Sequence, residues 1–545
     1  LIELRSGIER EWSDFPENLT LSEYHHQFDS APNSSPWTLT LRQQDVKESW
    51  TVSLNDQLLG RLVRDENDLQ CDFEIAAGIL RETDNELTIR SQSKNSDDIR
   101  IGNIELYQGT PTQRRSGSTI EVVITDTQHQ PLPGRITIVN EKGTLIPTIP
   151  IGSQSPSRHE STTADSIESD HRIDARLAAR EGVVYTASGH AYLSVQPGKY
   201  RIYAGRGFEY SVAEVQCEIK KGQHVKRTLI LEREVDTTGW IACDTHVHTV
   251  TYSGHGDCTL QERLITLAGE GIELPIATDH NTQIDYSSES LAMGTAKWFT
   301  PVVGNEVTTK RGHFNIFPTS ADAPRPNHQA ENWSQLFDSI FSNPTVQVAI
   351  LNHARDLHSD FRPFSPRHHI SLSGTNLDGF DRRFNAMELI NSGAMQTDPM
   401  ELFRDWCGLI NHGMAVTPIG SSDSHDVSRY IVGQGRTYIA GDDRNPRELD
   451  VSEAAKALVE GRVVVSYGLF ADLAATQNAG NREKSQPKTN AGEAIAGPGE
   501  LLRFDPESVE DLRLDGEVRF PSWSGVSSVE LWMNGQPWRG EENHS

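Results

Sequence analysis

The sequence predicts a multidomain chain: two β-sandwich domains, then an α/β barrel, then the opening strands of another β-domain. The chain has 545 residues, which is too many for a single hydrophobic core. Polar and apolar side chains alternate with period two over roughly the first 235 residues, which is typical of half-buried strands. Strand and helix patterns then alternate for about 200 residues, which favours a parallel sheet closed into a barrel.

Residues 1–110 predict the first β-sandwich. Its strand-like segments include Trp37–Leu41, Trp50–Leu54 and Glu86–Arg90, and short polar breaks separate them. A polar linker at 109–117 ends this region. We expect an antiparallel, jelly-roll-like sandwich.

Residues 118–235 predict a second β-sandwich, in which Ile120–Ile124 is a strand and Pro197–Gly198 supplies a turn. The stretch 153–170 is rich in Ser, Asp, Glu and His, which indicates a flexible insertion. The pattern over 131–200 resembles the small carboxypeptidase-regulatory-like (transthyretin-like) sandwich.

The barrel is expected over residues 238–470. Ile241–Cys243 and Val346–Leu351 are buried strands, and Thr259–Glu262 matches a capping box that opens a helix. Residues 500–545 then predict part of a further β-domain.

Composition excludes several classes of protein. The formal net charge of −27 disfavours a nucleic-acid partner, because no basic stretch is present to bind phosphates. No apolar run approaches the roughly 20 residues of a membrane span. The five scattered cysteines lack a CxxC pair and form no thiolate zinc motif. The chain begins at Leu1 rather than Met, so we expect a processed or partial chain, and the attached sandwiches hint at periplasmic or extracellular export.

Metal-ligand residues fall at the ends of predicted strands. His246 and His248 are one residue apart, so on a strand their side chains share a face, and Asp423 and His425 repeat that spacing. Other residues of ligand type follow or lie in further strands, namely Asp279, His280, Glu306, His353 and Glu388. Because the carboxyl ends of barrel strands form one rim, these residues predict a metal site there.

The motifs around these residues resemble those of the polymerase-and-histidinol-phosphatase (PHP) superfamily and, within it, the carbaryl hydrolase-like (CehA/McbA-like) metallohydrolases. The resemblance covers about residues 238–470. It is carried by Asp244-Thr245-His246-Val247-His248-Thr249, Ser253-Gly254-His255-Gly256-Asp257, Ala277-Thr278-Asp279-His280-Asn281, Gly304-Asn305-Glu306-Val307-Thr308, Gly312-His313-Phe314, Asn352-His353 and Gly420-Ser421-Ser422-Asp423-Ser424-His425.

This resemblance implies a seven-stranded, distorted (β/α)7 barrel that holds two or three divalent ions. The ligands implied for one ion are His246, His248, Glu306 and Asp423. Those implied for a second are Glu306, which bridges, with His353 and His313. Those implied for a third are His280, His425 and either Asp257 or His255, of which we prefer Asp257.

Histidine and carboxylate ligands without thiolates suit Zn²⁺, Mn²⁺ or Fe²⁺. Adjacent ions lower the pKa of a bridging water, which provides hydroxide near neutral pH. Asp244 and Asp279 are candidates to orient ligand imidazoles. Arg311 and Arg355 are candidates to bind an anionic group of the substrate. The residues expected to take part in catalysis are therefore His353, Asp257, Arg311 and Arg355.

The function these features predict is a metal-dependent hydrolase of a small-molecule phosphoester. The alternative with the same centre is hydrolysis of a carbamic or carboxylic ester. A hypothesis of another class is a glycan- or surface-binding protein with a vestigial barrel, because sandwiches are common in binding modules. The chain has no Gly-x-Ser-x-Gly elbow, P-loop or dinucleotide-binding fingerprint. The oligomeric state is left open.

Overall fold

The computed structural model describes residues 1–8, 10–11, 14–18, 22–93, 95–115, 117–151, 176–357, 362–394, 398–478, 494–501 and 511–538. The insertion predicted at 153–170 lies outside them. The chain divides into two compact units. Unit 1 comprises Leu1–Ala204 and Ala213–Ile230, and unit 2 comprises Gly205–Val212 and Leu231–Ser545. Unit 1 therefore holds both regions that were predicted as sandwiches.

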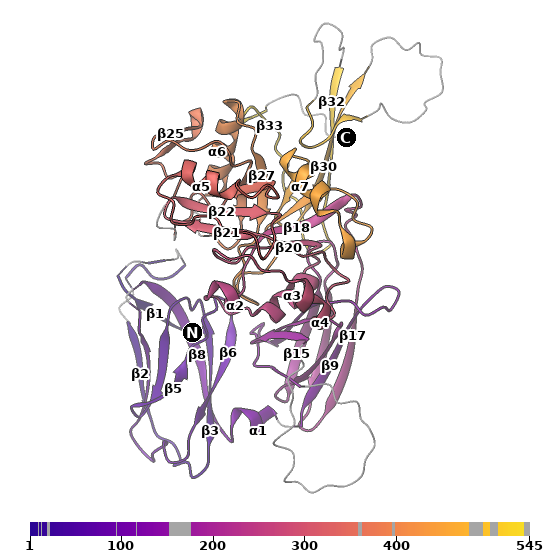
Figure 1. Cartoon of the computed structure of the whole chain (residues 1–545). Helices are drawn as coiled ribbons and strands as arrows, with labels where there is room; N and C mark the ends of the chain where they lie inside the picture. Colours follow the sequence, from indigo (N-terminus) through magenta and orange to yellow (C-terminus); the bar gives the residue numbers. More distant parts are fainter. Residues whose placement is uncertain are drawn as a thin grey trace. The chain divides into compact units, whose positions relative to one another are not determined.

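The first part of unit 1 consists of two four-stranded antiparallel sheets (Figure 1). One has the order β1-β8-β3-β6 and contains β1 (Ile2–Ser6), β3 (Trp37–Gln44), β6 (Leu69–Ile75) and β8 (Asp97–Gln108). The other has the order β2-β7-β4-β5 and contains β2 (Glu23–Phe28), β4 (Trp50–Leu54), β5 (Gln57–Arg61) and β7 (Asn85–Ser91). In β4, buried and partly exposed residues alternate, and Trp50, Val52 and Leu54 are the fully buried ones.

The second part of unit 1 follows the short helix α1 (Pro111–Arg115) and also has two sheets. The order β12-β13-β10-β15-β16 joins β10 (Gly134–Asn140), β12 (Leu177–Arg180), β13 (Val183–Thr186), β15 (Gly198–Gly205) and β16 (Ala213–Ile219). The order β11-β14-β9-β17 joins β9 (Thr119–Asp126), β11 (Ile149–Pro150), β14 (His190–Ser194) and β17 (His224–Leu231). The prediction that the chain is multidomain and rich in β-sandwich structure is confirmed.

Unit 2 contains two five-stranded sheets. The order β20-β19-β18-β28-β29 joins β18 (Trp240–Val247), β19 (Leu274–Ala277), β20 (Val302–Val303), β28 (Arg436–Ala440) and β29 (Val463–Ser466). The order β21-β22-β23-β26-β27 joins β21 (Asn305–Thr309), β22 (Gly312–Phe317), β23 (Val348–Leu351), β26 (Ala386–Asn391) and β27 (Thr417–Ser421). One buried cluster takes Ile241 and Ile276 from the first sheet and Ile350 and Ile419 from the second.

The predicted (β/α)7 barrel is wrong, because such a barrel needs one closed sheet of parallel strands. Here β28 is antiparallel to β18 and β29, and β22 is antiparallel to β21 and β23. The physical reason is visible between β21 and β22, where only Lys310 and Arg311 connect the strands. So short a turn reverses the chain and leaves no room for a crossover helix. Strand-like and helix-like patterns do not reveal strand direction, and this caused the error.

The described residues hold seven α-helices, six of them in unit 2. These are α2 (Val250–Ser253), α3 (Leu260–Gly269), α4 (Ser287–Met293), α5 (Trp333–Ile340), α6 (Pro399–Asn411) and α7 (Val451–Val459). The capping box expected at α3 is confirmed. The Thr259 hydroxyl accepts a hydrogen bond from the backbone N–H of Glu262, and the Glu262 carboxylate accepts one from the backbone N–H of Thr259.

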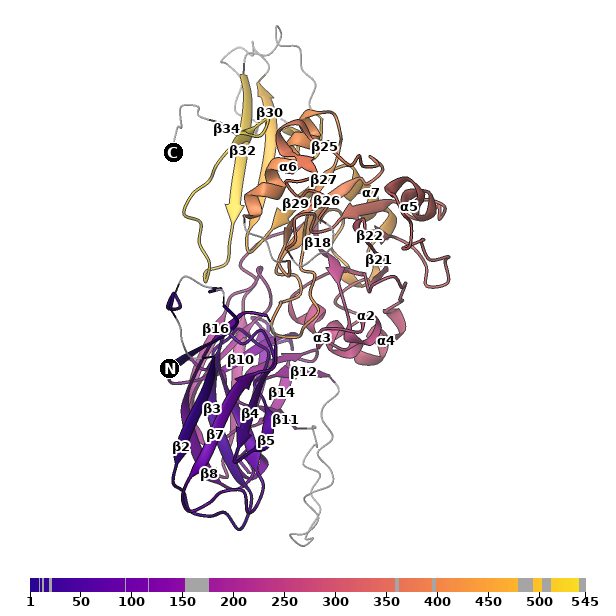
Figure 2. The same ribbon diagram turned by 90° about the vertical axis from the view of Figure 1, so that its left-hand side faces the viewer.

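A small irregular region of unit 2 contains β24 (His369–Ile370), the 3-10 turn Ser371–Ser373 and β25 (Thr375–Asn376), and a second 3-10 turn, Pro446–Glu448, precedes α7. Near the end of the chain, β30 (Phe470–Asn478) pairs with β31 (Ala494–Ala496) and β32 (Asp511–Arg519), and β33 (Trp532–Met533) pairs with β34 (Gln536–Pro537). Strands β30 and β32 lie side by side in both views (Figures 1 and 2). This sheet occupies part of the region predicted as a further β-domain.

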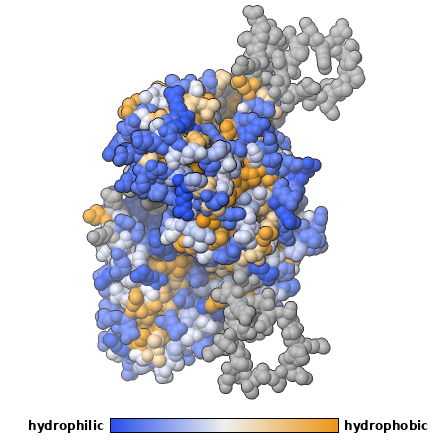
Figure 3. Space-filling view, in the orientation of Figure 1, coloured by the Kyte–Doolittle hydropathy of each residue, from blue (hydrophilic) through white to orange (hydrophobic). Residues whose placement is uncertain are grey.

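Polar residues cover most of the face drawn in Figure 3, with hydrophobic patches between them. Among the described residues, none of the helices combines the length and the apolar character needed to cross a membrane.

Candidate metal centre

The candidate site lies where strand ends of the two sheets of unit 2 meet. An isolated parallel bridge joins Val247, at the end of β18, to Ser424, just after β27. A second bridge joins His280, beyond β19, to Glu306 in β21. These contacts bring histidines and carboxylates from distant parts of the sequence together in a buried cluster.

His246 and His248, at the end of β18, point to the same face, as predicted, and both imidazoles approach the same oxygen of Asp423. Their Nε2 atoms lie 3.2 and 3.3 Å from Oδ1 of Asp423. Both imidazoles are fully buried, and the side chain of Asp423 is 15% exposed. The two motifs that stand some 175 residues apart in the sequence therefore meet at one carboxylate oxygen.

Glu306 is the centre of the cluster. Its carboxylate is 1% exposed and faces imidazole nitrogens of five histidines within 3.7 Å. The distances are 3.4 Å to His246 Nε2, 3.7 Å to His248 Nε2, 2.5 Å to His280 Nδ1, 3.2 Å to His313 Nδ1 and 3.4 Å to His353 Nε2. A carboxylate in this position can bridge two cations.

Three imidazoles of the cluster present a buried Nε2 atom without a hydrogen-bond partner among the described residues. They belong to His246, His248 and His425. In each ring Nδ1 faces another group: Glu388 Oε1 at 2.7 Å, Ser253 Oγ at 3.1 Å and the Asp423 carbonyl oxygen at 2.9 Å, respectively. A proton on Nδ1 leaves a lone pair on Nε2, which is the tautomer that binds a metal. The donor set therefore fits a divalent cation.

Among the described residues, ligand atoms that lie within 4.8 Å of one another define four possible metal groups. The groups are His246, His248 and Glu306; His246, His353 and Asp423; Glu306, His313 and His353; and His248, His280 and His425. Every ligand that the sequence resemblance implied belongs to one of them, except the two alternatives Asp257 and His255.

The loop after α2 offers two candidates for the third ion. Asp257 is exposed, and its Oδ1 accepts a hydrogen bond from the backbone of Val427 at 2.8 Å. The ring of His255 stacks on those of His425 and His280, with centroids 4.4 and 5.0 Å apart. The ring of His255 therefore contacts two members of the third group, and the preferred Asp257 uses one carboxylate oxygen to bind the Val427 backbone.

Charges in the cluster set the protonation of its members. Burial would raise the pKa of Glu306, but the surrounding histidines, His280 first among them, hold it well below its usual range. Burial, helped by His425, holds the pKa of His248 well below its usual range, and burial lowers the pKa of His425 to about 4. These two imidazoles are neutral at neutral pH, as metal ligands must be.

The opposite shift is found at His246 and His353. Burial would lower their pKa values, but Asp423 and Glu388 raise that of His246 well above its usual range. At His353, Glu306 and Asp423 raise the pKa to about 9. Protons here balance the carboxylates in the absence of a cation, so a bound cation would displace them.

Glu388 is the residue that orients His246, although the sequence pointed to Asp244. The fully buried carboxylate of Glu388 accepts hydrogen bonds from His246 Nδ1 at 2.7 Å and from the backbone N–H of His353 at 2.6 Å. Asp244 instead accepts from backbone N–H groups, including Ser422 at 3.1 Å. It holds the strand ends rather than an imidazole.

Asp279 acts on His248 through an intervening hydroxyl. Ser253 Oγ donates to Asp279 Oδ1 at 2.7 Å, so it accepts from His248 Nδ1. Tyr286, which is also buried, donates to the other oxygen of Asp279 at 2.7 Å. This chain fixes the tautomer of His248. Ser253 belongs to one of the motifs selected from the sequence. The role of its hydroxyl between His248 and Asp279, and the contact of Tyr286 with Asp279, could not be predicted from any sequence pattern.

The two arginines differ in their surroundings. Arg355 is held by Asp405, with Nε 2.6 Å from Oδ2, and by Glu401 at 3.3 Å. This engagement leaves little of its guanidinium for a substrate. Arg311 is exposed beside His313, and among the described residues only Nε of its guanidinium group is hydrogen-bonded, to the Glu331 carbonyl oxygen at 2.9 Å.

Backbone strain also gathers here. Asp423 has φ +52° and His353 has φ +24°, within the left-handed region that non-glycine residues rarely adopt. Residues held in such conformations cluster at functional sites.

No protein-family model matches the sequence, and no curated protein matches it. Among solved structures, the Bacillus anthracis TIE protein is 9% identical over 43% of this chain and 42% of that one, with a TM-score of 0.14. The major pilin subunit of Bacillus cereus is 11% identical over 38% and 65%, with a TM-score of 0.14. The Bifidobacterium dentium β-glucuronidase is 11% identical over 76% and 67%, with a TM-score of 0.15. The chain spans less than two-thirds of the first two, and similarity this low carries no argument about function.

Proposed function

We propose that this protein is a metal-dependent hydrolase of ester bonds, with a phosphoester as the expected substrate. The observation that carries the proposal is the buried carboxylate of Glu306 among five imidazoles, three cluster histidines having Nε2 atoms without a partner. Buried polar atoms are normally hydrogen-bonded, so several unpartnered nitrogens that converge on carboxylates indicate a cation site. The PHP-like motifs support the same proposal from the sequence.

The residues that would hold two ions are those that contact Glu306 and Asp423. His246, His248 and Asp423, with Glu306, would surround one cation. His313 and His353 would surround a second cation that shares Glu306. The group of His248, His280 and His425 would complete a third site. Bound divalent ions would supply Lewis-acid polarisation of the ester and acidify the attacking water.

The chain itself fixes the geometry in which this chemistry would occur. Asn352 donates to Glu306 Oε1 at 3.1 Å, and Asn391 donates to Asp423 Oδ2 at 3.2 Å. Each carboxylate is thereby held in one orientation, with its remaining lone pairs directed to the cluster. Such preorganisation removes the cost of reorienting ligands during the reaction.

A substrate would approach at the exposed edge of the cluster. Among the members of the four possible metal groups, His280 and His313 have the most exposed side chains, 22% and 24%. Arg311 precedes His313 by two residues, and its terminal nitrogens could meet an anionic group. Anion recognition at this edge is the feature that favours a phosphoester.

The alternative is a carbamic or carboxylic ester, since the same ligands would serve either bond. The test is to load the full chain with Zn²⁺, Mn²⁺ or Fe²⁺ and to assay p-nitrophenyl phosphate and an aryl N-methylcarbamate. Hydrolysis that is lost in His246→Ala and in Asp423→Ala supports the proposal, and the preferred substrate decides between the two bonds. If the loaded protein hydrolyses neither substrate, the proposal fails.

A further inference from the structure

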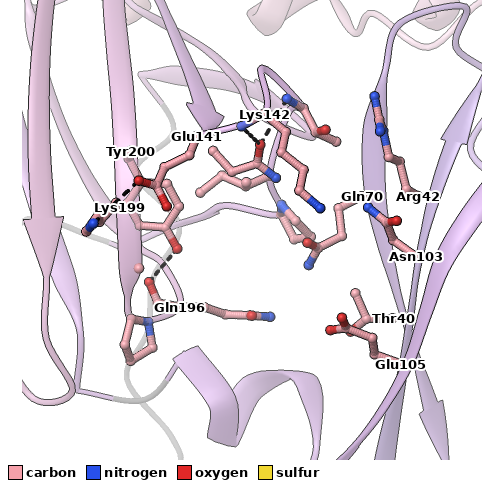
Figure 4. Close-up of a pocket in the computed structure, with 16 residues that line it drawn as sticks. Thr40, Arg42, Gln70, Asn103, Glu105, Glu141, Lys142, Gln196, Lys199 and Tyr200 are labelled. Carbon is pink, nitrogen blue, oxygen red and sulfur yellow. Dashed lines mark hydrogen bonds and ion pairs between the residues drawn. The ribbon is translucent and has the colours of Figure 1, made fainter.

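A polar cleft in unit 1 lies far in sequence from every residue of the metal cluster. Its volume is about 320 Å³. It is lined on one side by β3, β6 and β8 of the first sandwich and on the other by the turn after β10 and the start of β15 (Figure 4). The volume is at the lower end of the range for small-molecule sites, about 300–1,000 Å³.

Carboxamides are the most distinctive groups in this lining. Gln70, Asn103, Asn140 and Gln196 all line the cleft. In Figure 4, Gln70 and Gln196 extend from opposite sides into the space between the sandwiches. A carboxamide presents a donor and an acceptor on adjacent atoms. That pairing suits neighbouring hydroxyl groups, each of which both donates and accepts.

Part of the lining is held rigidly by Asp72, which is almost fully buried. Its Oδ1 accepts hydrogen bonds from Thr40 at 2.9 Å and from Gln70 at 3.2 Å. Its Oδ2 accepts from Gln196 at 2.8 Å, which ties the second sandwich to the same carboxylate. The polar groups of the cleft are thus positioned before any ligand arrives, and this reduces the entropy cost of binding.

Two exposed polar side chains of the lining, Asn103 and Lys142, have no hydrogen-bond or ion-pair partner among the described residues. Asn103 stands at a bulge of β8, where two residues oppose one of β3, and has φ +46°. A bulge re-aims a side chain, so the exposed Asn103 is available for contacts. Lys142 projects its ammonium group into the cleft from the other side (Figure 4).

The charge of the cleft argues against an anion as its ligand. Arg42 is occupied by Asp68, with Nε 2.7 Å from Oδ1, and Lys199 lies 3.5 Å from Glu141. Glu105 also lines the cleft and would repel an anion that Lys142 attracts. The positive charge of Lys142 is therefore balanced by the negative charge of Glu105, and the cleft has no excess of positive charge to attract an anion.

We propose that this cleft binds a neutral carbohydrate, about one or two sugar rings in size. Asn103, Lys142 and the amide groups of Gln70 and Asn140 would bind sugar hydroxyls, whereas the amide of Gln196 is already engaged by Asp72 and Arg114. This site is separate from the proposed hydrolase centre and requires no metal.

The test uses the full chain and neutral probes: the methyl glycosides of glucose, galactose, mannose and N-acetylglucosamine, together with cellobiose and lactose. Binding is measured by saturation-transfer difference NMR and calorimetry, with inorganic phosphate and glucuronate as anionic probes. The variants are Asn103→Asp and Lys142→Met. The matched control is Lys221→Met, which changes an exposed lysine in the turn between β16 and β17.

The proposal expects at least one neutral sugar to bind with a millimolar or lower dissociation constant. Each cleft variant should weaken that binding about tenfold, because each removes a hydrogen-bonding group, whereas Lys221→Met and treatment with a chelator should leave it unchanged. Three results would overturn the proposal: no neutral sugar binds, sugar binding is unaffected by both cleft variants, or only the anions bind in a way that depends on Lys142.

Discussion

Replacing Glu388 by Gln tests whether a buried carboxylate holds the metal-binding imidazoles. Glu388 accepts four hydrogen bonds, two at each oxygen. Oε1 accepts from His246 at 2.7 Å and Ser421 at 2.6 Å, and Oε2 accepts from the His353 backbone at 2.6 Å and Asn391 at 2.9 Å. Glutamine has nearly the same shape but offers only one acceptor oxygen.

The magnitude follows from this count. The amide group of Glu388→Gln can place its NH₂ at the position of either Oε1 or Oε2. In both cases the NH₂ faces two hydrogen-bond donors, which lose their acceptor. Each lost hydrogen bond to a charged group costs roughly 1.5–3 kcal/mol, so about 3–6 kcal/mol is divided between folding and metal affinity. If the Oε1 pair is lost, His246 is no longer held with its proton on Nδ1. We expect the affinity of the Glu388→Gln protein for metal to fall by about 10- to 100-fold.

The assay is competition of Zn²⁺ between the protein and a chromophoric chelator, with thermal unfolding measured in parallel. Glu453→Gln is the matched control, because it makes the same change at an exposed position on α7 of the same unit. A Glu388→Gln protein that folds and binds Zn²⁺ as tightly as the unaltered chain would refute this reasoning.

Three further predictions concern single side chains of unit 2. Ser253→Ala removes the hydroxyl that fixes the tautomer of His248, so Zn²⁺ affinity should fall about tenfold, and unchanged affinity in the chelator assay would exclude the relay. Burial raises the pKa of Glu273 from 4.5 to about 8, so the folded protein holds a proton that the unfolded chain releases. The stability of the protein should therefore fall by up to roughly 5 kcal/mol as pH rises from about 4.5 to 8, and urea titrations of Glu273→Gln should lack that part of the slope. Arg355→Ala leaves the buried carboxylate of Asp405 without its guanidinium, so urea unfolding should show a loss of about 3 kcal/mol, and a loss below about 1 kcal/mol would contradict a structural role.

The sequence was a good guide to where strands lie and a poor guide to how they pair. Alternating residues such as Trp50, Val52 and Leu54 report burial on one face, and the structure has that pattern. The relative direction of two paired strands could not be predicted in this way, because a strand has the same pattern of buried residues in a parallel and in an antiparallel sheet. The short connection at Lys310–Arg311 was the available clue that β21 and β22 form a hairpin.

The candidate site shows the same division. Histidines such as His246 and His248 could be selected because their spacing and strand-end positions are local features. Supporting residues could not be assigned in this way, since the contact between Glu388 and His246 spans 142 positions and depends on sheet packing. Asp244 is nearer in sequence, and for that reason it was the wrong choice as the residue that orients His246.

The central claim is that the histidines and carboxylates around Glu306 bind divalent metal. Elemental analysis of the full chain, purified gently without chelators, measures this most directly. The account predicts two or three Zn²⁺, Mn²⁺ or Fe²⁺ ions per chain, and a loss of metal in a folded His246→Ala, Asp423→Ala double variant. Less than about one ion per chain, or the same metal content in the double variant, would contradict it.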